Sequence, residues 1–442
     1  MVQEKIIPNH MDIYWHDYAD KTETVPITEA SMIEKSTLVG RVGLMLLACG
    51  TGAWRVRSSM NTVAKCLGLT CHANIGLMSI DYSCFDGNRS FSHSLSLNNT
   101  GVNTSKLDRL ERFVKKFPQE GIQMTAEQLH SRLDEINQSG NLYTPVLLGL
   151  ASALACGAFT FLLGGGIIEM ICAFIGAGIG NYLRCRLLQR HYTLFLCIVS
   201  SVALACLAYT AALRAAESLF AVPVQHEAGY ICAMLFIIPG FPFITSGIDL
   251  AKLDMRSGLE RLAYAVMIIV VATVTAWILA VILKLEPEDF VALSLGPALL
   301  FGLRLIASFC GVFGFSIMFN SPVPLAATAA LIGAVANTLR LELAELDAFP
   351  PAAAAFIGSL TAGLLASLLT KRLGYPRIAI TVPSIVIMVP GMYLYRGVYN
   401  LGEMSLTPSA SWLASALLII LALPLGLIFA RIITDRSFRH CT

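Results

Sequence analysis

Two Pro-Gly pairs interrupt long apolar segments of this chain. Pro239-Gly240 lies within LFIIPGFPFITSGIDL, and Pro390-Gly391 lies within IVIMVPGMYLYRGVYNL. Proline removes a backbone donor and clashes with the preceding helical turn, so each pair should break a helix. In lipid, a broken backbone is tolerated only against protein or a watery cavity, and paired breaks in corresponding spans are typical of a transporter's binding site. We therefore predict that these four residues bind a substrate, with half-helix ends presenting backbone groups to a carboxylate.

Charged residues are rare inside the apolar segments. Glu169 in GGGIIEMICAF and Arg304 in FGLRLIASFCG fall within predicted spans. A charge at such a depth is costly unless it is paired or hydrated, which makes each residue a functional candidate. We expect Arg304 to bind a substrate carboxylate and Glu169 to serve in gating or proton coupling. Alternatively, Glu169 caps a helix at the interface and Arg304 extends its guanidinium outward, and the two could also contact each other.

Two polar clusters lie at the ends of apolar segments. GIDLAKLDMRSGLER carries Asp249, Asp254 and Arg261, which we assign to an inner gate or a proton-linked carboxylate site. An ordinary charged loop is the alternative. Asn320 begins Asn320-Ser321-Pro322 after a long apolar run, and we group it with the substrate-binding residues, with a plain turn as its alternative.

The composition indicates what holds these residues. Hydrophobic residues make up 56% of the 442 positions and charged residues only 14%, with a mean hydropathy of +0.68. This is an integral membrane protein, because a soluble domain carries about 25% charged residues. A hydrocarbon core of about 30 Å needs about 20 apolar residues in a helix. We predict a mainly α, polytopic protein of about ten transmembrane helices, near 144–163, 167–187, 193–213, 229–249, 262–283, 297–319, 323–340, 350–370, 378–397 and 409–431.

The basic residues predict an orientation. Lys and Arg are far more frequent on one set of loops than on the other, which carries only Arg214, Lys284, Arg340 and Arg396. The positive-inside rule places the richer set in the cytoplasm, together with both termini. That set comprises Arg184, Arg186, Arg190, Lys252, Arg256, Arg261, Lys371, Arg372, Arg377, Arg431, Arg436 and Arg439.

A second pair of similar strings supports an internal repeat. The second span reads IGAGIGNYLR and ends at Arg184, while the seventh reads IGAVANTLR and ends at Arg340. Both this match and the Pro-Gly match join a span to the fifth span after it. Because five is odd, the two halves would be inverted relative to each other, as in transporters that alternate access around a midplane site.

The region before the first span predicts a small α/β domain in the cytoplasm. We expect a helical stretch over 37–67, and two alternating runs, NIGLMSIDYSCF and RSFSHSLSL, around the hairpin signal Asp86-Gly87-Asn88. Two amphipathic helices should follow, in SKLDRLERFVKKF and in TAEQLHSRLDEINQ with Thr125 as its cap. The predicted boundaries are a polar tail at 1–35, the α/β domain at 36–142, five-helix membrane units at 143–285 and 290–433, and a tail at 434–442.

Several strings, in this order, resemble the threonine/serine exporter family: GTGAWRVRSSMNTVAKCLGL, NNTGVNTSKL, PGFPFITSGIDLAKLDMRSGLERLA, FGFSIMFNSPVPLAATAALIGAVANTLR and VPGMYLYRG. The resemblance covers residues 36–433, and its two parts are similar to an enteric two-component pair associated with succinate export. It implies export from the cytoplasm across the bacterial inner membrane, driven by the proton motive force. One departure is Arg57, where the family usually has an acidic residue.

We therefore expect a secondary exporter of threonine/serine-type amino acids or of a dicarboxylate such as succinate. Its partners would be the small-molecule substrate, membrane lipid and possibly a second copy of the chain, but not nucleic acid. No phosphate-binding glycine loop and no Cys/His metal spacing is present, so we predict no ATP-driven pump, cofactor or metal. The alternative is a membrane-anchored metabolite sensor. An intramembrane enzyme is disfavoured because Thr245-Ser246-Gly247 has no histidine base at membrane depth.

Overall fold

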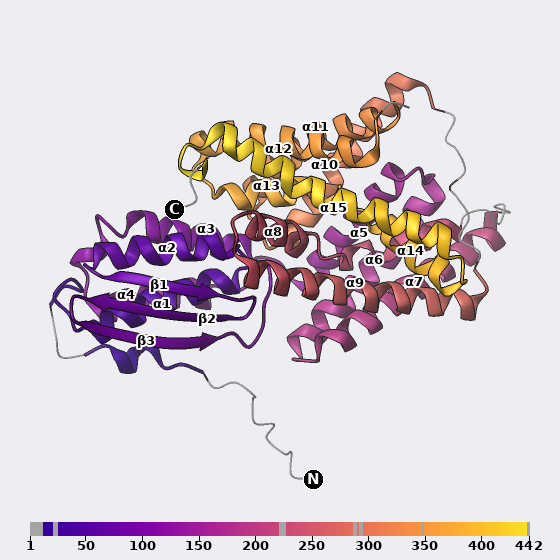
Figure 1. The fold of residues 1–442 in the computed structure, drawn as a ribbon. Coiled ribbons are helices and arrows are strands. Elements are labelled where there is room, and N and C mark those ends of the chain that lie inside the picture. Colours follow the sequence, from indigo (N-terminus) through magenta and orange to yellow (C-terminus); the bar gives the residue numbers. More distant parts are fainter. Residues whose placement is uncertain are drawn as a thin grey trace, which may run out of the picture. The chain divides into compact units, whose positions relative to one another are not determined.

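The computed structural model describes residues 12–20, 25–220, 227–285, 290, 295–346 and 349–439 (Figure 1). The chain forms two compact units. The first comprises residues 1–140 and 249–260, and the second comprises residues 141–248 and 261–442. The predicted tails at 1–35 and 434–442 fall partly outside the described residues.

A three-stranded antiparallel sheet lies in the first unit (Figure 1). Its strands, in the order β1-β2-β3, are β1 (Thr70–Ile75), β2 (Ser79–Asp86) and β3 (Arg89–Ser96). Asp86 pairs with Arg89 across a two-residue loop, which confirms the predicted hairpin. The first alternating run is not one strand, because Gly76 donates its N–H to the carbonyl of Ser79 at 2.8 Å and turns the chain between β1 and β2.

Helices cover one face of this sheet, where Ile80, Tyr82 and Cys84 are buried. The helices α1 and α2 pack on the strands, α3 packs on α1 and α2, and α4 packs on α1 and α3. The predicted helical stretch over 37–67 is two helices, because Gly50 adopts a positive φ of 83° after α1. The helical elements are η1 (Trp15–Tyr18), α1 (Met32–Ala48), α2 (Ala53–Cys66), α3 (Thr104–Lys116), η2 (Gly121–Gln123) and α4 (Ala126–Gln138).

The second unit is helical in its described part. Among the described residues, eight helices are long and apolar enough to cross a membrane, and all belong to this unit apart from the first six residues of α9. They are α5 (Pro145–Leu162), α6 (Ile167–Gln189), α7 (Leu194–Phe220), α9 (Met255–Leu283), α10 (Pro297–Met318), α11 (Val323–Ala344), α12 (Pro351–Leu373) and α15 (Leu406–Thr434). A short helix, η4 (Ser437–Arg439), follows α15.

Two further spans are bent pairs of shorter helices. The first pair is η3 (Glu227–Ile237) and α8 (Gly240–Ala251), with a bend of 59°. The second is α13 (Arg377–Val386) and α14 (Gly391–Gly402), with a bend of 49°. Counting each pair as one span gives ten, in agreement with the predicted number, and the bends lie at the two Pro-Gly pairs.

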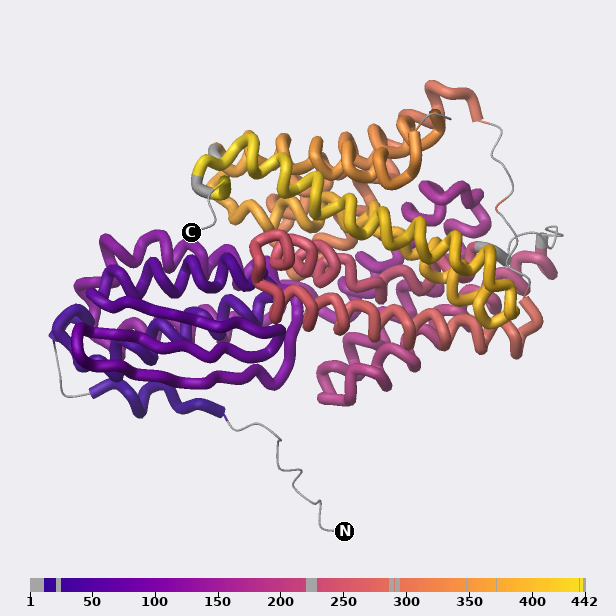
Figure 2. The backbone as a smooth tube through the Cα atoms, viewed as in Figure 1, coloured from indigo at the N-terminus to yellow at the C-terminus, as the bar shows by residue number. Residues whose placement is uncertain are grey.

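The helices of this unit pack in a connected bundle. Helix α6 packs against α5, α7 and η3, and α11 packs against α10, α12 and α13. Helix α10 packs on α5 and so joins the two sets, while α12 and α15 lie alongside each other (Figure 2).

Candidate functional site

The two helix breaks have the same backbone geometry. The N–H of Gly240 donates to the carbonyl of Ile238 at 2.8 Å, and the N–H of Gly391 donates to the carbonyl of Val389 at 2.8 Å. Each proline is thus the central residue of a three-residue turn, and Pro390 has the φ of −80° and ψ of 58° of an inverse γ-turn. The same kind of three-residue turn therefore changes the direction of the chain at both sites.

The two breaks also pack against each other. A Cβ on Gly240 would lie 3.2 Å from the side chains of Val386 and Val389, just before the second break. A Cβ on Gly391 would collide with Ile238 and lie 3.0 Å from Leu235, just before the first break. Each glycine faces the residues that precede the other proline, so the structure brings the four predicted Pro-Gly residues together.

A pair of buried tyrosines extends this contact. The hydroxyls of Tyr230 on η3 and Tyr395 on α14 are hydrogen-bonded, and their ring centroids are 5.8 Å apart in an edge-to-face arrangement. Both side chains are buried. The half-helix before the first break is therefore joined to the half-helix after the second break by a polar contact within an apolar setting.

The helix that begins at each break offers different donors. In α8 the N–H of Gly240 is used in the turn, Pro242 has none, and the N–H of Phe243 donates to the carbonyl of Pro239 at 3.2 Å. In α14 the N–H of Leu394 donates to the carbonyl of Pro390 at 3.1 Å. Helix geometry leaves the first-turn N–H groups without intrahelical partners, so two N–H groups in α14 and one in α8 lack such a partner.

Arg304 and Glu169 lie in different surroundings. Arg304 on α10 pairs with Glu342 at 2.8 Å and with Glu345, at the end of α11. Glu169 lies in the first turn of α6, where its side chain is 2% exposed and its Cβ is 2.9 Å from where a Cβ on Gly229 would lie. Arg304 is therefore paired with Glu342 in α11 and with Glu345, the residue that follows α11, rather than with Glu169.

Asn320 joins two segments of the backbone. It follows the last residues of α10 with a φ of 59°, and its Oδ1 accepts the N–H of Leu142 at 2.8 Å. The next carbonyl, of Ser321, accepts the hydroxyl of Tyr143 at 2.7 Å. These bonds hold the segment before α5 against the end of α10.

Residues 249–260, a charged segment that runs from the end of α8 to the start of α9, belong to the first unit. Asp249 is fully buried, and its carboxylate accepts the N–H of Ala53 at 3.0 and 3.1 Å and the hydroxyl of Ser257 at 2.9 Å. It caps the N-terminus of α2, where a carboxylate is favoured. Arg57, on the same helix, donates to Asp254 at 2.6 Å. Two of the three residues assigned to a gate thus anchor this segment on α2.

The other charged residues of this segment extend the anchoring. Glu260 accepts the N–H of Leu77 at 2.6 Å, in the turn between β1 and β2. Arg256 donates to Asp81 at 2.9 Å and to Ser79 at 3.1 Å. Arg261, the third residue assigned to the gate, is 2% exposed, lies in α9, and is the residue at which the chain returns to the second unit.

Two residues of α11 were missed by the sequence reasoning. The Nη1 of Arg340 lies 3.4 Å from the carbonyl of Met388, two residues before Pro390, and its Nε is buried without a hydrogen-bond partner. Asn337, one turn earlier, donates from Nδ2 to Ser308 at 2.9 Å, and its buried Oδ1 has no partner. The signal was present, because the repeated string IGAVANTLR contains both residues, but Arg340 was counted as a loop residue.

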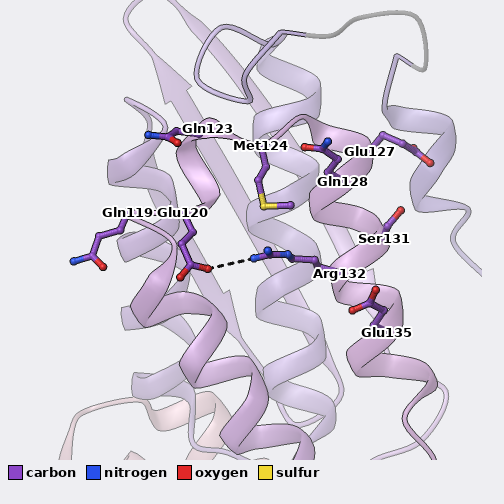
Figure 3. Close-up of a pocket in the computed structure, with 9 residues that line it drawn as sticks. All are labelled: Gln119, Glu120, Gln123, Met124, Glu127, Gln128, Ser131, Arg132 and Glu135. Carbon is purple, nitrogen blue, oxygen red and sulfur yellow. Dashed lines mark hydrogen bonds and ion pairs between the residues drawn. The ribbon is translucent and has the colours of Figure 1, made fainter.

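A separate groove lies on the first unit, beside η2 and α4 (Figure 3). Its volume is about 700 Å³, and Arg132 reaches Glu120 across it at 3.5 Å. Both side chains are about half exposed, so the groove holds no buried charge that would select a ligand. Among the described residues, no three His, Cys, Asp or Glu side chains form a group that could hold a metal ion.

Comparison with known proteins gives two matches that follow each other along the chain. Residues 37–283 match a family model described as a threonine/serine exporter. Residues 304–433 match a second model, described as Threonine/Serine exporter, ThrE. The first match alone covers more than half of the chain. No curated protein and no solved structure matches this chain.

Proposed function

Because this chain belongs to the threonine/serine exporter family, we propose that it exports a small carboxylate-bearing metabolite around its paired helix breaks. The family is one of transporters rather than enzymes, and the apolar helices make the chain a multi-pass membrane protein. The proposed substrates are threonine, serine or a dicarboxylate such as succinate. The proposed route runs from the cytoplasm across the bacterial inner membrane, driven by the proton motive force.

One observation carries this proposal: the two breaks pack reciprocally. Gly240 lies against Val386 and Val389, while Gly391 lies against Ile238 and Leu235. Broken helices expose helix ends that lipid does not satisfy, so burying one break against the other concentrates polar backbone in a single place. Discontinuous helices that meet in this way are the usual setting of substrate and ion sites in secondary transporters.

Matching details in the two halves support an inverted repeat. After α5, the N–H of Gly164 donates to Phe161 and that of Gly165 to Thr160, at 3.0 and 2.9 Å. After α10, the N–H of Asn320 donates to Ile317 and that of Ser321 to Ser316, at 2.9 and 3.1 Å. Gly164 and Asn320 both have positive φ, which is the conformation that this helix cap requires.

Side chains and packing repeat in the same register. Asn181 of α6 donates to a carbonyl of α5 at 2.9 Å, and Asn337 of α11 donates to Ser308 of α10 at 2.9 Å. Helix α6 packs on α5, α7 and η3, as α11 packs on α10, α12 and α13. With five spans in each half, rocking one half against the other would expose the paired breaks to the two sides in turn.

The remaining assignments of the proposal come from charge and burial. Basic residues favour a cytoplasmic location for both termini and for the α/β domain at 36–142. Glu169, buried in α6, is the proposed site of proton coupling, because a carboxylate at membrane depth is a usual member of proton relays. Asp249, Asp254 and Arg261 are the other residues proposed for gating or proton coupling of the membrane units at 143–285 and 290–433.

The test is transport by the purified protein in proteoliposomes. We expect labelled threonine or succinate to leave the vesicles faster when a proton gradient is imposed, and a protonophore to abolish the stimulation. Unlabelled amino acids and dicarboxylates, added in turn, should compete only if they are substrates. Absence of exchange for every compound, with the protein folded and inserted, would leave a membrane-anchored sensor as the better explanation.

A further inference from the structure

We propose that Arg340 and Asn337 of α11 form the binding position for the substrate carboxylate and the donor group next to it. The proposal rests on the proposed transport function and adds the chemistry that recognises the substrate. Arg340 would bind the carboxylate, and Asn337 would accept a hydrogen bond from a neighbouring ammonium or hydroxyl group.

Arg340 lies at the second helix break. Its Nη1 lies 3.4 Å from the carbonyl of Met388, which precedes the Pro390 turn by two residues. Gly358 of α12 lies against it, since a Cβ at Gly358 would be 3.0 Å from the Cβ of Arg340 and 3.2 Å from the Sδ of Met388. Arg340 therefore lies where α11, α12 and the segment after α13 meet, and its guanidinium lies beside the backbone that precedes the Pro390 turn.

The charge of Arg340 is not neutralised by the described part of the chain. Arg304 shows the contrast, because it pairs with both Glu342 and Glu345. For Arg340 the described residues supply one carbonyl and no carboxylate, and its Nε is buried without a partner. A guanidinium packed among apolar helices is costly without a counter-ion, and its fork of donors suits a carboxylate. An anionic substrate would supply both the charge and the acceptor.

Asn337 adds an acceptor on the same face of α11. It precedes Arg340 by three residues, a spacing that puts two side chains on one helix face. Asn337 is 1% exposed, its Nδ2 is held by Ser308, and its Oδ1 has no donor. A buried acceptor left unpaired is destabilising, so a ligand that donates to Oδ1 gains from the contact.

The two groups together favour one substrate class. A carboxylate for Arg340 and an adjacent donor for Asn337 are both present in a 2-amino or 2-hydroxy acid. Succinate supplies the carboxylate but has no donor beside it. The same pattern occurs in the other half, where Asn181 Oδ1 and Arg184 Nε are also buried without partners among the described residues.

The experiment measures the KM of counterflow for wild type, Arg340→Gln, Arg340→Lys and Asn337→Leu in proteoliposomes. The probe is labelled threonine, or labelled succinate if the wild type exchanges only that. The control is Arg186→Gln, an exposed arginine whose Nε lies 3.1 Å from the hydroxyl of Tyr182. Thermal unfolding of each variant separates loss of recognition from loss of folding.

We expect Arg340→Gln to raise KM by about tenfold or more, because a hydrogen bond to a charged group is worth roughly that factor. Arg340→Lys should retain part of the affinity, and Asn337→Leu should weaken competition by threonine more than by succinate. A KM within about twofold of wild type in both Arg340 variants overturns this proposal and leaves the transport function standing. If the Gln variant does not fold, the Lys variant decides the question. A wild type that exchanges neither compound overturns the proposed function itself.

Discussion

At the scale of single residues, the bonding partner separates the structural charges from those available to a substrate. Asp249 is buried because it accepts two hydrogen bonds at the start of α2 and one from Ser257. Arg304 is satisfied by two carboxylates. Ala53 is 196 positions from Asp249 in the sequence, and Glu342 and Glu345 are 38 and 41 positions from Arg304. Asp249 and Arg304 stood out in the sequence as charged residues within or beside apolar segments. Their partners could not be predicted, because local sequence patterns do not indicate contacts between such distant positions.

The cap formed by Asp249 gives a stability prediction. Asp249→Ala removes the acceptor of the Ala53 N–H and leaves it buried, which should lower the free energy of unfolding of the first unit by roughly 1–3 kcal/mol. Hydrogen exchange of the α2 amides in the full chain is the measurement, with the exposed Asp12→Ala as the control. Equal protection of α2 in the two variants would show that the cap is dispensable.

A second residue-scale feature joins η1 to α4. His16 bonds Asp134 through Nε2 at 2.6 Å and Glu127 through Nδ1 at 2.8 Å, and these hydrogen bonds raise the pKa of His16 above 6.5. Arg41 also pairs with Asp134 and bonds His130, whose pKa burial lowers to about 3. Protonation of His16 therefore stabilises the folded state, whereas protonation of His130 destabilises it.

The signs of these shifts predict how η1 is held. A raised pKa means that His16 contributes stability that is full below pH 6.5 and lost as pH rises through the folded-state value. The amides of η1 and the facing part of α4 should exchange more slowly at pH 6 than at pH 9, after correction for intrinsic rates. His16→Asn should abolish this difference, and His72→Asn, at an exposed strand position, should keep it. Protection that is independent of pH in wild type would contradict the prediction.

At the scale of elements, the sequence predicted the spans and both breaks because hydrophobic length and Pro-Gly chemistry are local properties. It missed the turn between β1 and β2, whose backbone is held by Glu260 from a segment about 180 positions away. It also merged α1 and α2, which separate where Gly50 has positive φ and Asp249 caps the second helix. Elements defined by remote contacts were therefore the ones that local patterns did not reveal.

The packing of one break on the other predicts a compensating pair of mutations. Gly391→Ala places a Cβ against the Cδ1 of Ile238, and overpacking of this kind costs about 1–3 kcal/mol. Ile238→Val removes that methyl, so the double variant should recover part of the lost thermal stability. Gly302→Ala, on α10 in open space, is the control. If the double variant lost as much thermal stability as the two single variants together, the two breaks would not be in steric contact in the membrane.

At the scale of the whole molecule, the chain alternates between its two units. It leaves the membrane unit after Ile248, contributes residues 249–260 to the first unit, and returns at Arg261. Composition was sufficient to predict a membrane protein with a polar head, and the family matches bear out the exporter assignment. The excursion was not predictable, because it depends on Asp249 and Glu260 finding backbone donors in α2 and in the sheet.

The central claim is that transport takes place at the paired breaks. The direct measurement is counterflow of labelled threonine and succinate by wild type, by Pro390→Ala combined with Gly391→Leu, and by the control Gly302→Leu. All three proteins must reach the vesicle membrane in equal amounts and stay folded at the assay temperature. We predict that wild type and control exchange substrate and that the break variant does not. Wild-type exchange rates in a folded break variant would contradict the claim.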